Sequence, residues 1–95
     1  MYTVYLLHFT RPYRQGTHRH YIGYTNNMER RMKQHRTGGG ARLVKHAIGI
    51  GIEFEVAMTQ ECETRVEARR MELAWKARHG ASRMCPICNR NGQEQ

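Results

Sequence analysis

The sequence has 95 residues, 39% of them hydrophobic, and carries a formal net charge of +8 with a pI near 10.0. This length suits one domain with one modest core and leaves no room for several domains. No stretch approaches the roughly 20 apolar residues that a membrane span needs. The apolar start, Met1 to Phe9, has no basic n-region and no small-residue cleavage site. We therefore expect a strand there and not a signal peptide.

The positive charge is concentrated in the first half of the chain. Residues 1–50 contain nine Lys or Arg and one acid, Glu29, whereas residues 51–95 contain seven bases and seven Glu. This asymmetry predicts a basic face that binds nucleic-acid phosphates, although a solvated face with no partner remains the alternative. The residues expected to contact nucleic acid are Arg14, Arg19, Lys33, Arg36, Arg42 and Lys45.

The lack of Asp and the number of cysteines restrict the metal ligands and disulfides that this chain can form. The chain contains no Asp, so a hard metal ion would be held mainly by Glu. The three cysteines are an odd number without a secretory signal, which argues against a disulfide framework. We expect reduced thiols and a cytoplasmic location.

The first half of the chain predicts two strands and a helix. Residues 3–9 are rich in β-formers and apolar on both alternating faces, as in a central strand. A polar loop over residues 10–19 precedes a second strand at residues 20–24, so we expect a hairpin with a long connection. Asn26 and Glu29 have capping-box spacing and predict a helix from about residue 27 to 36, which the glycines at 38–40 end.

The second half predicts one more strand and a longer helix. Residues 41–46 suit a short helical turn, and residues 52–58 alternate as an edge strand does. Thr64 and Glu67 form a capping box, so a helix should run to about residue 79 with Gly80 as its C′ residue. The tail from residue 81 looks like a loop because it contains Pro86. The fold class is α/β of the α+β kind: one domain, residues 1–95, with a three-stranded, mainly antiparallel sheet flanked by helices.

Several spaced motifs carry a resemblance to a known family. Tyr21-Ile22-Gly23 follows a strand that bears the motif Thr3-Val4-Tyr5, and a helix with Arg31 and His35 comes next. With these motifs the chain resembles the GIY-YIG nuclease family. The segments Glu67–Trp75 and Pro86–Asn89 are similar to the family's Glu-containing helix and its closing Pro-x-x-Asn. The resemblance extends over residues 3–89 and is nearest to the catalytic domain of branch-cutting, structure-specific nucleases.

The resemblance implies a metal-dependent DNA endonuclease that uses Mg²⁺ or Mn²⁺ and leaves a 5′-phosphate. It implies that Glu72 binds the metal, that Tyr5 is the general base and that Tyr21 positions the attacking water. Arg31 would hold a phosphoryl oxygen, and His35 would assist proton transfer or hold a phosphate. Asn89 would order the site from the C-terminal side. Excision-nuclease members place a Lys just after the second motif, where this chain has Tyr24.

Physical chemistry supports these roles unevenly. Helical spacing places Glu72 in an apolar neighbourhood, where an unpaired carboxylate is costly, although a solvated Glu is the alternative. Arg31 and His35 are four residues apart and share a helix face, yet a surface Arg and a core His fit too. Tyr5 and Tyr21 could be ordinary core aromatics, because a phenol is a poor base at pH 7 unless positive charge lowers its pKa.

Cys85-Pro86-Ile87-Cys88 is half of a zinc site, which Cys62 and His79 could formally complete. These two flank a long helix and should lie roughly 20 Å apart, so we expect structural thiols instead. Two further functions stay open: a non-catalytic nucleic-acid-binding module on the same scaffold, and an adaptor dimer bridged by zinc. A nuclease this small is also expected to need a protein partner or a homodimer for specificity. We do not expect it to bind a membrane.

Overall fold

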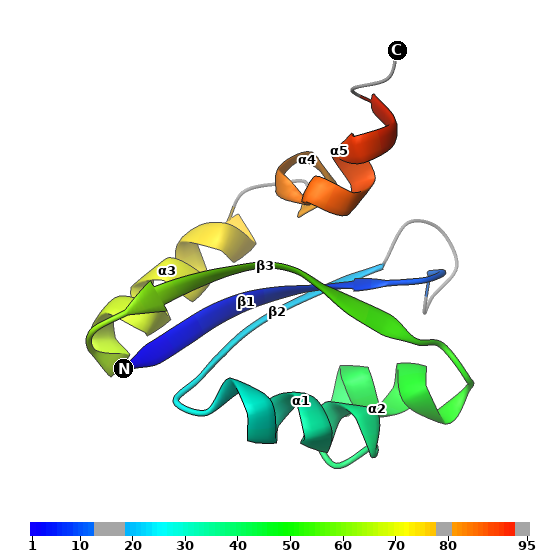
Figure 1. The fold of residues 1–95 in the computed structure, drawn as a ribbon, viewed down its shortest axis with the longest axis horizontal. Helices are drawn as coiled ribbons and strands as arrows, with labels where there is room; N and C mark the ends of the chain where they lie inside the picture. The colour runs from blue at the N-terminus through cyan, green and yellow to red at the C-terminus, as the bar shows by residue number, and fades with distance from the viewer. Residues whose placement is uncertain (13–18, 78–80, 93–95) are drawn as a thin grey trace.

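A three-stranded antiparallel sheet forms the centre of the protein (Figure 1). The computed structural model describes residues 1–12, 19–77 and 81–92. The strands are β1 (Tyr2–Phe9), β2 (His20–Thr25) and β3 (Phe54–Cys62), in the order β2-β1-β3. Both pairings of β1 are antiparallel. The predicted fold class, the central first strand, the hairpin and the edge position of the third strand are confirmed.

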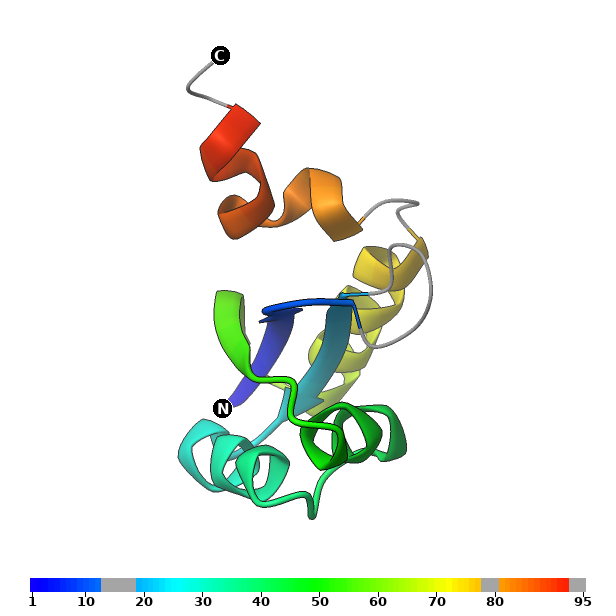
Figure 2. The same cartoon turned by 90° about the vertical axis from the view of Figure 1, so that its right-hand side faces the viewer.

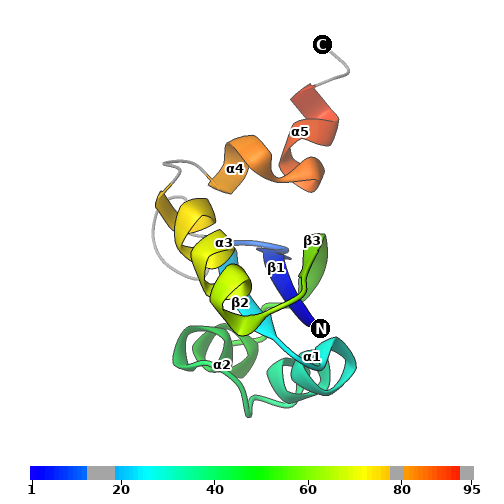
Figure 3. The same cartoon turned by 90° about the vertical axis from the view of Figure 1, so that its left-hand side faces the viewer.

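Helices lie on both faces of the sheet. They are α1 (Met28–Arg36), α2 (Arg42–Gly49), α3 (Arg65–Ala77), α4 (Ala81–Met84) and α5 (Pro86–Gly92). Figures 2 and 3 show α1 and α2 together on one side of the sheet, with α3 and the C-terminal helices on the other. In the described part of the chain, no helix has the length and apolar character that a membrane crossing requires.

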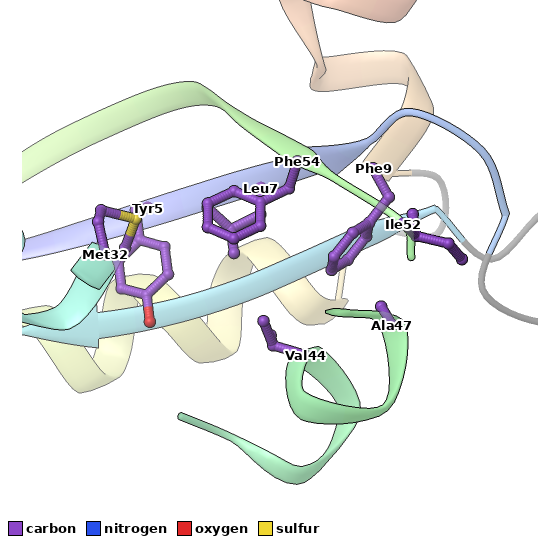
Figure 4. Close-up of a cluster of buried hydrophobic side chains, with 8 residues drawn as sticks. All are labelled: Tyr5, Leu7, Phe9, Met32, Val44, Ala47, Ile52 and Phe54. Atoms are coloured by element: carbon purple, nitrogen blue, oxygen red, sulfur yellow. The ribbon is translucent and has the colours of Figure 1, made fainter. Parts of the chain in front are cut away.

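The alternation of β1 divides the core in two. Tyr5, Leu7 and Phe9 point toward α1 and α2 and pack in one buried cluster (Figure 4). Val4 and Leu6 point the other way and pack with residues that include Trp75 and Cys85. Because β1 is buried on both faces, its side chains can be held rigidly in either layer.

Local capping explains where two of the helices begin. The side chain of Asn27 accepts a hydrogen bond of 3.0 Å from the backbone N–H of Arg30, so the cap of α1 is one residue later than the predicted Asn26. The predicted cap of α3 is confirmed, since Thr64 Oγ1 accepts from the Glu67 N–H at 3.1 Å. The Glu67 carboxylate accepts in return from the backbone of Glu63.

Three segments differ in extent or type from the sequence-based expectation. The third strand starts two residues later and runs to Cys62, because residues 59–62 continue to pair with the start of β1. The expected turn at residues 41–46 is part of a full helix, α2. The expected loop from residue 81 is wrong, since α4 and α5 occupy it. Pro86 is the first residue of α5, where a helix tolerates proline because no backbone donor is lost.

Candidate functional site

Tyr5 lies at the middle of the sheet and is fully buried. Its strand partner on β2 is Gly23. A Cβ at that position would lie 2.7 Å from the Tyr5 hydroxyl oxygen and 3.0 Å from the Tyr21 ring. The glycine of the Tyr21-Ile22-Gly23 motif therefore allows the Tyr5 hydroxyl to lie close against the backbone of β2, because a larger residue would clash with it. Figure 4 shows that hydroxyl directed away from β1.

His35 is the hydrogen-bond partner of Tyr5. Its Nε2 lies 2.8 Å from the Tyr5 hydroxyl oxygen, and its side chain is fully buried. Its Nδ1 is buried with no hydrogen-bond partner among the described residues. A Cβ at residue 40 would lie 2.2 Å from that Nδ1. Gly40 therefore does more than follow a helix end, because it makes room for the imidazole.

The rings of Tyr5, Tyr21 and His35 form a triangle. Their centroids are 6.3 Å apart for the two tyrosines, and 5.8 and 5.7 Å from the imidazole. The two contacts with His35 are edge-on, a favourable geometry for aromatic pairs. Phe54 closes another side of the imidazole with centroids 6.2 Å apart. The packing fixes the orientation of the two phenols and the imidazole.

Arg31 from α1 and Glu72 from α3 bring opposite charges to this triangle. Burial raises the pKa of Tyr5 to about 12, and Arg31 lowers it in part while Tyr21 and Glu72 add to it. The pKa of Tyr21 is raised by burial as well, against the effect of Arg31. Burial, with the help of Arg31, lowers the pKa of His35 to about 4. At pH 7 the resting site thus holds two neutral phenols and a neutral imidazole beside the Arg31 guanidinium.

Glu72 is a largely buried carboxylate on α3. Its side chain is only 14% exposed and lies 3.7 Å from the ammonium group of the exposed Lys76. Its own carboxylate oxygens suit Mg²⁺ or Mn²⁺ better than a soft ion. A single carboxylate leaves most coordination positions to water and substrate, as Mg²⁺ commonly does. The residues present therefore fit a hard divalent cation at Glu72.

The structure brings five of the six predicted catalytic residues together and places the sixth elsewhere. Tyr5, Tyr21, Arg31, His35 and Glu72 are the five. Asn89 lies in α5, where its side-chain amide donates to the backbone carbonyl of Arg83. Its proposed role stays a prediction. Tyr24, in the position of the family's Lys, accepts a hydrogen bond of 3.4 Å from Arg65 Nε.

Most of the predicted phosphate contacts are exposed on the α1–α2 side. Lys33 and Arg36 belong to α1, and Arg42 and Lys45 to α2; all four are exposed. The Arg36 guanidinium lies 5.0 Å from the centre of the Phe54 ring. Arg19 is half-buried, and its Nε is buried without a hydrogen-bond partner among the described residues. Arg14 lies outside the described residues.

A second group of chemically active side chains was missed by the sequence-based analysis. His8, His20, Cys85 and Cys88 each offer one ligand atom, and all four atoms lie within 4.8 Å of one another. His8 and His20 are directly opposite in the β1–β2 pairing, although twelve residues separate them in sequence. The register of the hairpin was the signal that could have paired them.

The sequence pattern suggested Cys62 and His79 as partners of Cys85 and Cys88, and not His8 and His20. Cys62 pairs with Tyr2, at the opposite end of β1 from His8, and is not a member of the cluster. His79 lies outside the described residues.

Comparison with known proteins agrees with the motifs. The model of the GIY-YIG catalytic domain matches residues 1–84. No curated protein and no solved structure matches the chain. The family match covers most of the sequence and includes Tyr5, Tyr21, Arg31, His35 and Glu72. The chain therefore belongs to the GIY-YIG catalytic-domain family of nucleases.

Proposed function

We propose that the protein is a metal-dependent DNA endonuclease that hydrolyses phosphodiester bonds, with residues 1–95 acting as one catalytic domain. The observation that carries this proposal is the convergence of Tyr5, Tyr21 and His35 with a guanidinium and a half-buried carboxylate. Phosphodiester hydrolysis needs an activated water and charge stabilisation at the phosphoryl oxygens. The two charged groups and the buried hydrogen bond supply parts suited to each need.

Tyr5 is the proposed general base. As a phenolate it would take a proton from the attacking water, and Tyr21 beside it would orient that water. Tyr5 is protonated at rest, since its pKa is about 12. Its proton must be lost to solvent before it can act as a base. The proposed part of His35 is to orient the phenol, since its Nε2 lies 2.8 Å from the Tyr5 hydroxyl oxygen.

Arg31 and Glu72 are the proposed charge-handling groups. The fork of the Arg31 guanidinium suits bidentate contact with phosphoryl oxygens. Glu72 would hold Mg²⁺ or Mn²⁺, and a bound ion supplies Lewis acidity toward the phosphoryl group. Arg31 also lies beside Tyr5, where its charge opposes the effect of burial on the pKa of that phenol. Asn89 is retained as a sixth participant, on the strength of the family resemblance.

The substrate is proposed to be DNA, whose phosphates are held along the α1–α2 side by exposed Lys and Arg side chains of these helices. Branched or single-stranded DNA is the favoured class, following the resemblance to structure-specific nucleases. One active site cuts one strand, so a partner or a homodimer is proposed to supply specificity. The reduced thiols and the proposed DNA substrate favour a cytoplasmic location.

A panel of branched, duplex and single-stranded DNA, incubated with Mg²⁺ or Mn²⁺, tests this proposal. Wild-type protein should cut at least one substrate, and Arg31→Ala should lower the rate by about 10²–10³-fold. Arg30→Ala is the matched control, because Arg30 is an exposed neighbour on the same helix. No cleavage of any substrate would overturn the proposal, as would equal losses in the two variants.

A non-catalytic nucleic-acid-binding module is the second candidate. The observation in its favour is the resting protonation of the site, where neither Tyr5 nor His35 is primed as a strong base at pH 7. This candidate predicts DNA binding without a metal requirement. It also predicts that Tyr5→Phe and Glu72→Gln bind as tightly as wild type and that none of the proteins cleaves DNA.

A further inference from the structure

The C-terminal segment reaches the sheet through two cysteines. Cys85 lies between α4 and α5 and is fully buried, while Cys88 lies in α5 and is half-buried. Both thiols lie 3.5 Å from His8 Nδ1, and Cys88 Sγ lies 3.4 Å from His20 Nε2. The two imidazole nitrogens are 3.3 Å apart. Four ligand atoms, from β1, β2 and the C-terminal segment, thus lie within 4.8 Å of one another.

Hydrogen bonding alone does not explain this geometry. One imidazole nitrogen has either one N–H or one lone pair, which lies in the ring plane. His8 Nδ1 nevertheless has three neighbours at 3.3–3.5 Å, two of them sulfurs. A single donor or acceptor cannot serve all three well. Several ligand atoms in mutual contact are the arrangement found around a metal ion.

The separations match a tetrahedral zinc site. With Zn–N bonds near 2.0–2.1 Å and Zn–S bonds near 2.3 Å, a tetrahedron spaces its ligands about 3.3 Å apart for N to N and about 3.6 Å for N to S. The measured values are 3.3 Å for the two nitrogens and 3.4–3.5 Å for three nitrogen–sulfur pairs. The remaining pairs also lie within 4.8 Å.

We propose that His8, His20, Cys85 and Cys88 form a structural Zn²⁺ site that fastens the C-terminal helices to the β1–β2 hairpin. Two thiolates and two imidazoles are the soft and borderline donors that Zn²⁺ prefers, unlike the hard carboxylate of Glu72. Four protein ligands close the coordination shell, so the ion has no open position for a substrate.

The position of the site explains what the ion would stabilise. Figure 1 shows α4 and α5 at one end of the sheet, away from the layer of α1 and α2. Their described apolar contacts with the second core cluster come from Met84, Cys85, Ile87 and Cys88. Helices this short are marginal by themselves, so a metal bond to the hairpin would supply much of their order. Asn89, the residue after Cys88, would be held in place by the same bonds.

Metal analysis of the purified full chain, expressed without added metal and without a metal-binding tag, tests the proposal directly. Wild-type protein should contain about one zinc per chain. Cys88→Ser and His20→Ala should lose most of it, whereas the matched control Cys62→Ser should retain it, because Cys62 lies outside the cluster. Chelation should lower the melting temperature of wild type on the order of 10 °C and leave that of Cys88→Ser nearly unchanged.

Cobalt substitution of the wild-type protein keeps the test decisive even if the variants fail to fold. Co²⁺ in a two-thiolate, two-imidazole tetrahedron gives strong visible bands and a thiolate charge-transfer band in the near ultraviolet. Addition of Zn²⁺ should abolish both. Weak octahedral spectra, a Cys85–Cys88 disulfide in place of bound metal, or equal zinc loss in Cys62→Ser would each overturn the proposal.

The two metal sites can be told apart in the same preparation. The zinc assays need no DNA, so their outcome is independent of nuclease activity. Because all four ligands come from one chain, removal of zinc should leave the oligomeric state unchanged. Dissociation of a dimer on chelation would instead show that zinc bridges two chains, which contradicts the site within one chain.

Discussion

The hydroxyl of Tyr5 is subject to two opposing influences. Burial favours the neutral phenol, whereas the positive charge of Arg31 and its hydrogen bond favour loss of the proton. The first dominates at rest, since the pKa of Tyr5 is about 12. A base that is mostly protonated leaves a signature in the dependence of rate on pH.

The rate of cleavage should therefore rise with pH. Below the pKa of Tyr5 the phenolate fraction increases tenfold per pH unit, so we expect log(kcat/KM) to increase with a slope near +1 from roughly pH 7 to 9. Tyr5→Phe should lower the rate by about 10²–10⁴-fold and remove the slope. Tyr2→Phe, on the same strand, should keep the wild-type cleavage rate and its slope with pH. Single-turnover rates across this range provide the measurement, and a flat wild-type profile would refute Tyr5 as the base.

His35 makes stability depend on pH. Its folded-state pKa is lowered from 6.5 to about 4, so between these values the unfolded chain binds the proton and the folded one does not. Stability is fully present above pH 6.5 and is lost as the pH falls toward 4, by about 2–3 kcal/mol for this fully buried residue.

Urea denaturation at pH 7 and pH 4 isolates this contribution when His35→Asn is compared with wild type. The variant should lose less stability on acidification, because the other histidines titrate equally in both proteins. His46→Asn is the control, since His46 is exposed on α2. An acid loss in His35→Asn as large as that in wild type would show that His35 is not held neutral.

At the scale of elements, the site depends on how closely β2 approaches the Tyr5 ring. Gly23→Ala would insert a Cβ 2.7 Å from the hydroxyl oxygen of Tyr5, whose side chain is fully buried. We expect a loss of about 1–3 kcal/mol in the free energy of unfolding and a larger proportional loss in cleavage rate. Thermal denaturation and cleavage assays measure the two effects.

Gly49→Ala is the matched substitution, because a Cβ there meets nothing within 4 Å and Gly49 ends α2. It should preserve both stability and rate. If Gly23→Ala behaved like Gly49→Ala, the close approach of β2 to Tyr5 would not be what positions the phenol.

The α1–α2 pair presents the basic surface. Removal of exposed charges there should weaken DNA binding uniformly across sequences and lower the slope of log K against log salt by about 0.7–0.9 per phosphate contact. Lys33→Ala combined with Lys45→Ala should show this in fluorescence anisotropy over a salt series. Arg70→Ala, which removes an exposed charge from α3 instead, should leave the slope unchanged. An equal change of slope in the double variant and in Arg70→Ala would mean that DNA binding depends on net charge and not on the α1–α2 surface.

For the whole molecule, the sequence was most informative where spacing is local. The strands, the α1 helix and the Thr64 cap follow from short-range patterns, and five site residues follow from motif spacing. The His8–His20 pairing was missed because it depends on a register across a twelve-residue gap. The C-terminal helices were missed because Pro86 suggested a break, although proline is tolerated as a first helical residue.

Two metal ions with different chemistry are thus proposed for one small domain. The carboxylate of Glu72, on α3, suits a hard ion that exchanges with water and substrate. The His8–Cys85 end suits zinc held for structure. Catalysis should therefore respond to added Mg²⁺ over a range of concentration in which zinc content does not change.

The most direct test of the nuclease assignment is the initial rate of Mg²⁺-dependent DNA cleavage by wild type, Glu72→Gln and the exposed control Glu61→Gln. Wild type and Glu61→Gln should cleave at equal rates that vanish on removal of Mg²⁺. Glu72→Gln should be slower by at least about 10²-fold, while it binds DNA no more weakly. Undiminished cleavage by Glu72→Gln would contradict the account.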